Sequence, residues 1–161
     1  MLGLMNRRRG GRRGQTLVEF ALILPIFVLL LMGILDLGRA VYYSSTLSNA
    51  AREAARRAIV DQTCSHVSDF AVQRAVGMQN VTTTVWWTSP TGATTRSCSP
   101  ESGAASIGDI THVTVEYDFN AATPIIGNLV GTIHLQGESA FPVEATCIQD
   151  TPAGTVCPPG S

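Results

Sequence analysis

The stretch Arg12-Arg13-Gly14-Gln15-Thr16-Leu17-Val18-Glu19-Phe20 leads directly into an apolar run at residues 21–35. A basic cluster ends at a glycine, and one carboxylate follows five residues later, where the apolar run begins. A charged side chain at the centre of a bilayer costs roughly 2.5–3.5 kcal/mol, and less near the membrane edge. Glu19 is therefore the first candidate for a functional role.

The apolar run predicts a membrane anchor. Residues 20–35 are uncharged, and the run reaches about the ~20 residues that span a bilayer if Glu19 and Asp36 lie at its two interfaces. Residues 1–14 carry five arginines and no acid, which predicts a cytoplasmic N-terminus with the remainder outside. We expect a disordered basic leader at residues 1–14 and a transmembrane helix at residues 15–37.

The helix is predicted to continue beyond the membrane as a stalk at residues 38–60. Small and apolar residues recur at spacings of three and four and form one narrow face. That face comprises Leu37, Ala40, Val41, Ser44, Leu47, Ala51, Ala54, Ala55 and Ala58. Pro25 removes one helical hydrogen bond, which predicts a kink or local softening. From Gln15 to Val60 the rod would measure roughly 69 Å.

The following residues predict an α+β head at 61–150. A short helix at 67–78, capped by Ser65 or Ser68, has apolar residues at helical spacing. After Asn80 apolar and polar residues alternate, as in a half-buried antiparallel sheet. The apolar face of this pattern carries Val81, Val85, Trp87, Val113, Val115, Tyr117, Phe119, Ile133, Leu135, Phe141 and Val143.

The predicted fold class is therefore α+β, with a long N-terminal transmembrane helix, a short second helix and a small antiparallel sheet of three to four strands. Residues 89–109 are interpreted as a long loop, and residues 121–131 as a turn or short helix against the core. Gly137 is expected to mark a bulge or to split the last strand in two. A Pro/Gly-rich tail follows at residues 151–161.

Four cysteines, Cys64, Cys98, Cys147 and Cys157, all follow the apolar run. An even count in an exported region predicts two disulfides, for which three pairings are open. We favour Cys64–Cys98, which ties the end of the stalk to the long loop, and Cys147–Cys157, which pins the tail. Buried free thiols are the alternative, and a cytosolic domain would favour them.

Catalytic patterns are missing from the sequence. It has no paired carboxylates and no phosphate-binding loop, and Ser139 does not match the nucleophile-elbow pattern. Among the three histidines and four cysteines, Cys64 and His66 form the only close pair, so no metal site is predicted. His112 and His134 fall on polar strand positions and are expected to be exposed. We therefore expect no enzymatic activity, no cofactor and no small-molecule substrate.

Charge and aromatic residues narrow the choice of partners. The basic leader lacks interleaved aromatic residues and adjoins an apolar run, which argues against nucleic-acid binding. Without residues 1–14, six arginines face 12 acids, so the remaining chain carries a formal charge of −6. Of the adjacent Trp86 and Trp87, one ring is expected in the core and the other at the surface.

The leader resembles that of type IV prepilins. In those proteins a peptidase cuts after a glycine that ends a short basic leader, and the fifth residue of the mature chain is usually Glu. Gly14, Gln15 and Glu19 occupy these positions. The resemblance implies cleavage between Gly14 and Gln15 by a prepilin peptidase. It also implies that Glu19 pairs with the N-terminal amine of a neighbouring subunit, which compensates two charges in lipid and sets the axial register.

Three further stretches resemble the TadE-like family, whose members are pseudopilin-like components of the Tad (Flp, tight-adherence) pilus system. They are Glu19-Phe20-Ala21-Leu22-Ile23-Leu24-Pro25, Gly33-Ile34-Leu35-Asp36-Leu37-Gly38-Arg39-Ala40 and Asn49-Ala50-Ala51-Arg52-Glu53-Ala54-Ala55-Arg56. The resemblance implies a structural minor pilin or pseudopilin in the cytoplasmic (inner) membrane. Its partners would be membrane lipid and other pilins and pseudopilins of the Tad system, and its entry into a cell-surface pilus stays open.

Two features of the helix can each be interpreted in two ways. Asp36 and Arg39 are either a solvated interfacial pair of little energetic value or an intersubunit contact, since the family pattern retains an acid and an arginine here. The alanine-rich face at residues 50–58 reflects either plain helix propensity or close packing between helices. We favour the packing role.

Two other classes of protein stay open. Gly38-Arg39-Ala40 satisfies the signal-peptidase rule of an ordinary secreted protein, although the leader would be overlong. A bitopic adhesin or receptor would stay anchored and would not polymerise. A mature chain that begins at Gln15, one that begins at Val41 and an uncut chain distinguish the three classes.

Overall fold

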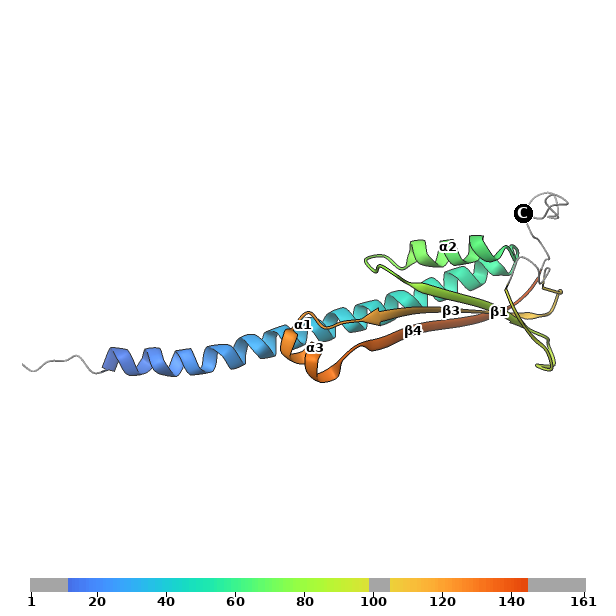
Figure 1. The fold of residues 1–161 in the computed structure, drawn as a ribbon. Coiled ribbons are helices and arrows are strands. Elements are labelled where there is room, and N and C mark those ends of the chain that lie inside the picture. The colour runs from blue at the N-terminus through green and yellow to red at the C-terminus, as the bar shows by residue number, and fades with distance from the viewer. Residues whose placement is uncertain (1–11, 99–104, 145–161) are drawn as a thin grey trace, which may run out of the picture.

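The computed structural model describes residues 12–98 and 105–144, while residues 1–11, 99–104 and 145–161 lie outside the described part of the chain. Within that part, three helices and four strands follow one another along the chain. The head lies along the C-terminal half of the long helix, and the N-terminal half extends beyond it (Figure 1). The predicted α+β fold, with a long N-terminal helix and a small antiparallel sheet, is confirmed.

Helix α1 runs from Arg12 to Ala58, and its 47 residues make a rod of about 70 Å at 1.5 Å per residue. Pro25 lies inside it without interrupting it. The helix begins earlier than predicted, so the end of the basic leader is helical instead of disordered. Extending an existing helix by a few residues costs little compared with nucleating one. Arg56 and Arg57 lie in the last turn, where positive charge is favourable.

Helix α2 comprises Cys64–Arg74 and packs against α1 and β1. It begins three residues earlier than predicted, so Ser65 and Ser68 lie inside the helix and do not cap it. Thr63 is the N-cap residue, and its backbone N–H donates a hydrogen bond of 3.0 Å to the carboxylate of Asp61. The connection between α1 and α2 is therefore fixed by an acid that the sequence analysis had not singled out.

The sheet has the strand order β2-β1-β3-β4, and every neighbouring pair is antiparallel. Its strands are β1 (Thr82–Thr88), β2 (Thr95–Ser97), β3 (Ile110–Phe119) and β4 (Ile133–Pro142). Strand β2 was not predicted, because its three residues are all exposed and carry no alternating pattern. Between β3 and β4 lies helix α3 (Pro124–Val130), within the segment expected to hold a turn or short helix against the core. The helix does not join the core, because Leu129 and Val130 are exposed.

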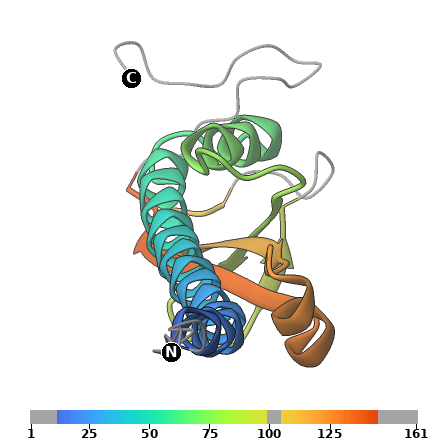
Figure 2. The same ribbon diagram turned by 90° about the vertical axis from the view of Figure 1, so that its left-hand side faces the viewer.

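Helices α1 and α2 cover one face of the sheet (Figures 1 and 2). The core between the helices and the sheet consists of small and branched apolar side chains from α1, α2 and the sheet. Its buried members are Leu47, Ala51, Ala54, Ala55, Ala58, Val67, Ala71, Val85, Val113 and Val115. Half of this set comes from α1, so the second half of the long helix is an integral part of the head.

The two tryptophans of β1 separate as predicted. Trp87 is buried beside Ala105 and Val143, whereas Trp86 is only partly buried. The ring of Trp86 stacks on the ring of His112, with centroids 5.2 Å apart. That contact covers His112, so the prediction of an exposed His112 is wrong. His134 is exposed, as predicted.

Strand β4 passes through Gly137 without a bulge or a break. Gly137 pairs with Val115 in the same regular register as its neighbours. Its buried face lies directly against the backbone of α1 at Leu47 and Ser48. The predicted bulge or split is therefore wrong, and the glycine instead lets a helix and a strand approach each other closely.

Candidate assembly surface on the long helix

The N-terminal half of α1 presents apolar side chains on every side. Every residue from Gly14 to Met32 is exposed, and the segment is long and apolar enough to cross a membrane. A helix that is apolar all round is a membrane span or is buried by other chains. Length and composition thus make this half of α1 a candidate single membrane span.

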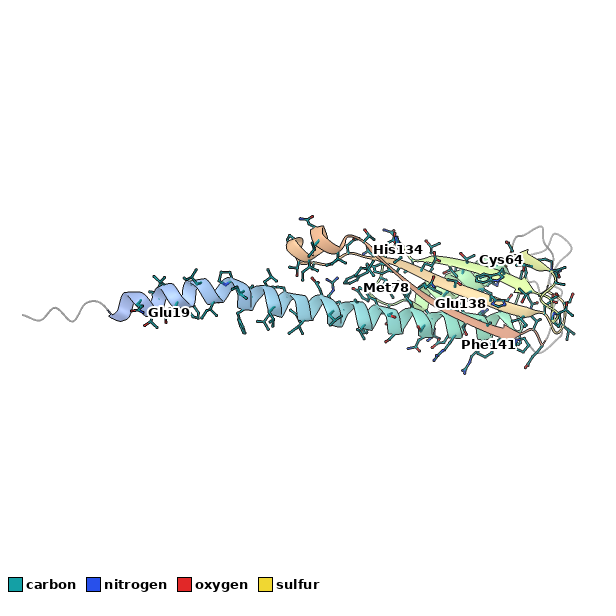
Figure 3. All side chains as sticks on the ribbon, turned by 90° about the horizontal axis from the view of Figure 1, so that it is seen from below. Glu19, Cys64, Met78, His134, Glu138 and Phe141 are labelled. Atoms are coloured by element: carbon teal, nitrogen blue, oxygen red, sulfur yellow. A yellow bond between two sulfur atoms is a disulfide. The ribbon has the colours of Figure 1, made fainter. Side chains whose placement is uncertain are left out.

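Glu19 lies within this exposed segment, far from the head (Figure 3). The side-chain amide of Gln15 donates to the Glu19 carboxylate at 3.4 Å, one helical turn away. Both side chains are exposed, and the distance is long for a hydrogen bond. No ion pair to Glu19 occurs among the residues whose side chains the structure describes.

Gly14 lies in the first turn of α1 and is exposed. A β-carbon built at this position would meet nothing within 4 Å. The fold therefore gives no packing reason for a glycine here. A requirement for glycine at this position would have to come from a molecule that acts on the chain.

Asp36 joins the long helix to the far end of the sheet. Its carboxylate accepts hydrogen bonds of 3.0 Å from the backbone N–H groups of Ala122 and Thr123, just before α3. The residue is only 6% exposed. Arg39 lies 3.7 Å away and is half exposed. Asp36 is thus an internal clamp and not a solvated partner of Arg39, and its bonding partners are too distant in sequence for a local pattern to reveal them.

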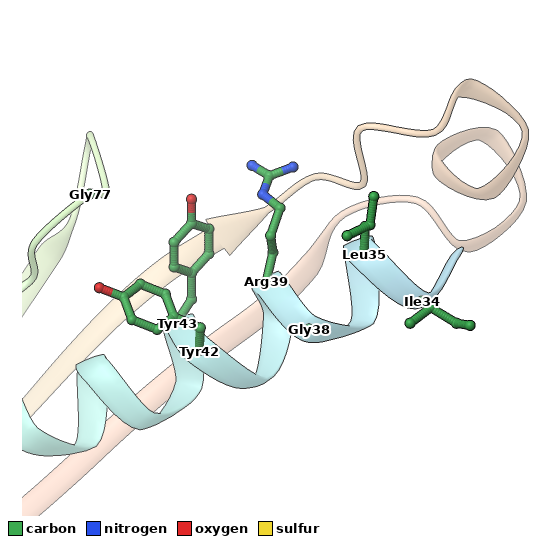
Figure 4. Close-up of a pocket in the computed structure, with 7 residues that line it drawn as sticks. All are labelled: Ile34, Leu35, Gly38, Arg39, Tyr42, Tyr43 and Gly77. Atoms are coloured by element: carbon green, nitrogen blue, oxygen red, sulfur yellow. The ribbon is translucent and has the colours of Figure 1, made fainter. Parts of the chain in front are cut away.

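Arg39 and two tyrosines border an open groove of about 630 Å³ beside α1 (Figure 4). The Arg39 guanidinium lies 5.8 Å from the ring centres of both Tyr43 and Phe119. Tyr42 lies on the same stretch of helix and is exposed. Aromatic rings are enriched where membrane proteins leave the bilayer, which agrees with a membrane boundary just before this groove.

The alanine-rich face of α1 is a close-packing surface, but its partners lie within the same chain. Ala50, Ala51, Ala54, Ala55 and Ala58 have no exposed surface at all. The sheet and α2 cover this face. The surface that α1 can offer to other subunits is therefore its N-terminal half, not the alanines.

A disulfide joins Cys64, at the start of α2, to Cys98, just after β2, with Cα atoms 5.7 Å apart. This is the pairing that the sequence analysis favoured. Closing a loop of 34 residues stabilises a fold by about 3–5 kcal/mol in the chain-entropy account. Cys147 and Cys157 lie outside the described residues.

Polar clusters in the described part of the head have structural partners. Asp61 lies 3.1 Å from His66 and 3.4 Å from Arg57, and it also holds the N-terminus of α2. No group of three His, Cys, Asp or Glu side chains that could hold a metal ion occurs among the described residues. On the sheet, the Thr88 hydroxyl lies 3.1 Å from Nε2 of His112, and a Glu138 carboxylate oxygen lies 3.6 Å from Nδ1 of the same ring.

A long apolar helix that carries an α+β head on its second half is the arrangement expected of a single-pass membrane protein. More particularly, residues 14–56 match the family model described as TadE-like protein. The match includes Gly14, Glu19, Asp36, Arg39 and the alanine-rich face as far as Ala55, so the resemblance to this family is confirmed over these residues. It relates the chain to the Tad pilus system. The chain matches no curated protein and no solved structure.

Proposed function

We propose that this protein is a minor pilin or pseudopilin of a Tad-type pilus. It enters the cytoplasmic membrane with its N-terminus inside and its head outside. A prepilin peptidase cuts between Gly14 and Gln15, and the exposed half of α1 then packs among the helices of other pilins and pseudopilins. The role is structural and requires no catalysis.

The observation that carries this proposal is the division of α1 into two halves. The C-terminal half is buried in the head, where Leu47 and Ala51 have no exposed surface. The N-terminal half is exposed from Gly14 to Met32 and is apolar on every side. A helix built this way can exchange lipid for neighbouring helices without disturbing the head.

Glu19 supports assembly over simple anchorage. An unpaired carboxylate in a span is costly, and an anchor gains nothing from it. A partner charge from a neighbouring subunit removes that cost. The new N-terminus at Gln15 lies one helical turn from Glu19, so the corresponding amine of a second subunit can reach the same depth in the membrane.

The geometry of α1 argues against the secreted alternative. Cleavage between Ala40 and Val41 would cut within the continuous helix Arg12–Ala58. It would remove Asp36, which holds the residues before α3, and Arg39, which lies over Phe119. The head would lose two of its own contacts.

The test is the mature N-terminus of protein expressed with a prepilin peptidase, read by mass spectrometry. We expect Gln15 in wild type, an uncut chain in Gly14→Arg, and Gln15 again in Gly38→Leu. Gly38→Leu blocks signal peptidase, because it places a large residue where a small one is needed. A start at Val41 that is lost in Gly38→Leu would overturn the proposal, as would an uncut wild-type chain.

Glu19→Gln tests the assembly step, because it removes the charge and keeps the size. Membrane insertion and cleavage should persist, while pili or the assembly complex should be lost. Glu144→Gln, at an exposed site in the head, is the matched control and should assemble normally. Normal pili in Glu19→Gln would contradict pairing between subunits and leave a bitopic anchored protein as the better reading.

A further inference from the structure

Helix α3 is the part of the head that lies nearest to the membrane span. It sits beside α1 where the exposed half begins (Figures 1 and 2). Asp36 bonds to the residues just before it. The side chain of Ile126, on α3, lies 3.3 Å from the position of a β-carbon on Gly33. Helix α3 is therefore level with residues 33–36 of α1.

That level falls at the edge of the bilayer. The uncharged run 20–35 has 16 residues, which is shorter than the ~20 residues that a hydrocarbon core requires. The core must therefore take in the last turn of this run, up to Leu35. Any part of the head level with Gly33 consequently meets lipid headgroups or the first acyl carbons, and not bulk water.

The surface of α3 suits such a place. Residues 119–133 contain no charged side chain. Leu129 is 85% exposed and Val130 is 55% exposed. Farther from the membrane, on the paired strands, lie Asp118 and His134, which contact each other. The first charged side chains of these strands therefore lie just beyond the level of the membrane span.

We infer that α3 is a membrane foot, whose exposed Leu129 and Val130 insert into the interface of the outer leaflet beside α1. The inference rests on the proposed membrane insertion of α1. The head then touches the membrane at two points, the span and the foot, which fixes its orientation about the helix axis. Asp36 lies under the foot, where two backbone N–H groups compensate its charge at the bilayer edge.

The test uses the full-length protein in vesicles of phosphatidylethanolamine and phosphatidylglycerol. A photoreactive benzophenone side chain is placed at Leu129, at Leu30 within the span, or at Ile107. Ile107 is the matched control, because it is an exposed aliphatic residue (71%) just before β3, at the end of the sheet away from α3. Lipid adducts are expected at positions 129 and 30, and none at 107.

The outcomes separate the foot from the span. Adducts at position 30 without any at 129 overturn the foot and leave the proposed insertion intact. If position 129 forms adducts with a second copy of the protein in place of lipid, α3 is a contact between subunits, and this result also overturns the membrane foot. If no lipid adduct forms at position 30, this part of α1 does not span the membrane, and both the proposed function and the membrane foot are contradicted.

Hydrogen exchange in the same vesicles avoids the bulky probe. Leu129→Asp should speed exchange of the amides at residues 126–133, because the charged side chain lifts the foot from the lipid. Ile107→Asp should leave those amides unchanged. Because the Leu129 side chain is exposed in the folded chain, Leu129→Asp should not disturb the contacts within the head itself. Equal exchange in wild type and Leu129→Asp contradicts the inference.

Discussion

Gly137 on β4 faces Leu47 on α1 with no room for a side chain between them. A β-carbon at Gly137 would stand 2.4 Å from the carbonyl carbon of Leu47 and 2.5 Å from its oxygen. Both are backbone atoms, which cannot rotate aside as the end of a side chain can. The helix and the sheet are thus held at a separation that only glycine permits.

Gly137→Ala should therefore destabilise the head. Forcing one extra carbon into a packed site costs typically about 1–3 kcal/mol, and here α1 and β4 must move apart to admit it. Thermal unfolding of the full-length protein in detergent, followed by circular dichroism, should show a lower midpoint than wild type.

Gly38→Ala is the matched control for that measurement. A β-carbon there would meet nothing within 4 Å, and alanine is favoured over glycine in a helix by about 1 kcal/mol. Its midpoint should equal or exceed that of wild type. A Gly137→Ala midpoint equal to that of Gly38→Ala would contradict the close contact.

Asp36→Asn should loosen the junction between the span and the head. The amide retains one oxygen but turns an N–H donor toward the backbone N–H groups of Ala122 and Thr123. An unsatisfied buried donor costs roughly 1–3 kcal/mol. Hydrogen exchange at Ala122 and Thr123 should accelerate, whereas Arg39→Gln should change it far less, because Arg39 is half exposed. Unchanged hydrogen exchange in Asp36→Asn would show that Asp36 does not hold the residues before α3.

Asp61 should make the head less stable in acid. Burial raises the pKa of Asp61, but hydrogen bonds from Thr63 and His66 outweigh it and hold the pKa below its ordinary value of 3.8. A depressed pKa in the folded state contributes stability above the unfolded pKa, and this stability is lost as the pH falls through the folded value. The free energy of unfolding should therefore decrease below about pH 4.

Asp61→Asn supplies the comparison for that pH dependence. The variant should be less stable than wild type at pH 7, and the difference should shrink as the pH falls below 4. Unfolding midpoints at pH 7, 5 and 3 measure it. A difference that stays constant from pH 7 to pH 3 would show that the Asp61 charge contributes nothing.

The head should need the second half of α1 in order to fold. A fragment that starts at Tyr42 loses the contacts of Asp36 and Arg39 with the head, but it retains Leu47 and the buried alanines and omits the span, so it should still be soluble and unfold cooperatively. A fragment that starts at Asp61 lacks half of the core and exposes apolar strand surface, which favours aggregation. Size-exclusion chromatography of the two fragments decides the matter, and an equally soluble Asp61 fragment would refute this packing.

Local patterns in the sequence were sufficient to predict the long helix, the buried face of its second half from Leu47 onward and three of the four strands. Leu37 and Val41, which were expected on the same face, are exposed. Spacing of three and four identified Leu47, Ala51 and Ala54 before any partner was known, because amphipathic period depends only on the helix itself. Alternation likewise predicted Val113 and Val115 as core residues. These features are set by neighbours along the chain.

Features that depend on distant residues were missed or misread. The predicted pairing of Asp36 with Arg39 is present at 3.7 Å, but the hydrogen bonds that Asp36 accepts from residues 86 and 87 positions away were missed. Strand β2 exists through pairing with β1 and through the ion pair of Arg96 with Asp109, neither of which leaves a periodic pattern. Gly137 was misread because the pattern of a strand does not show what lies against it.

Continuity of α1 has a mechanical consequence. The helix has no break between the membrane half and the half that lies alongside β3 and β4 (Figure 3). A pull along its axis therefore loads the helix–sheet interface in shear, so that many contacts resist together and none is peeled away first. Tension on the membrane half therefore reaches the head through one continuous helix.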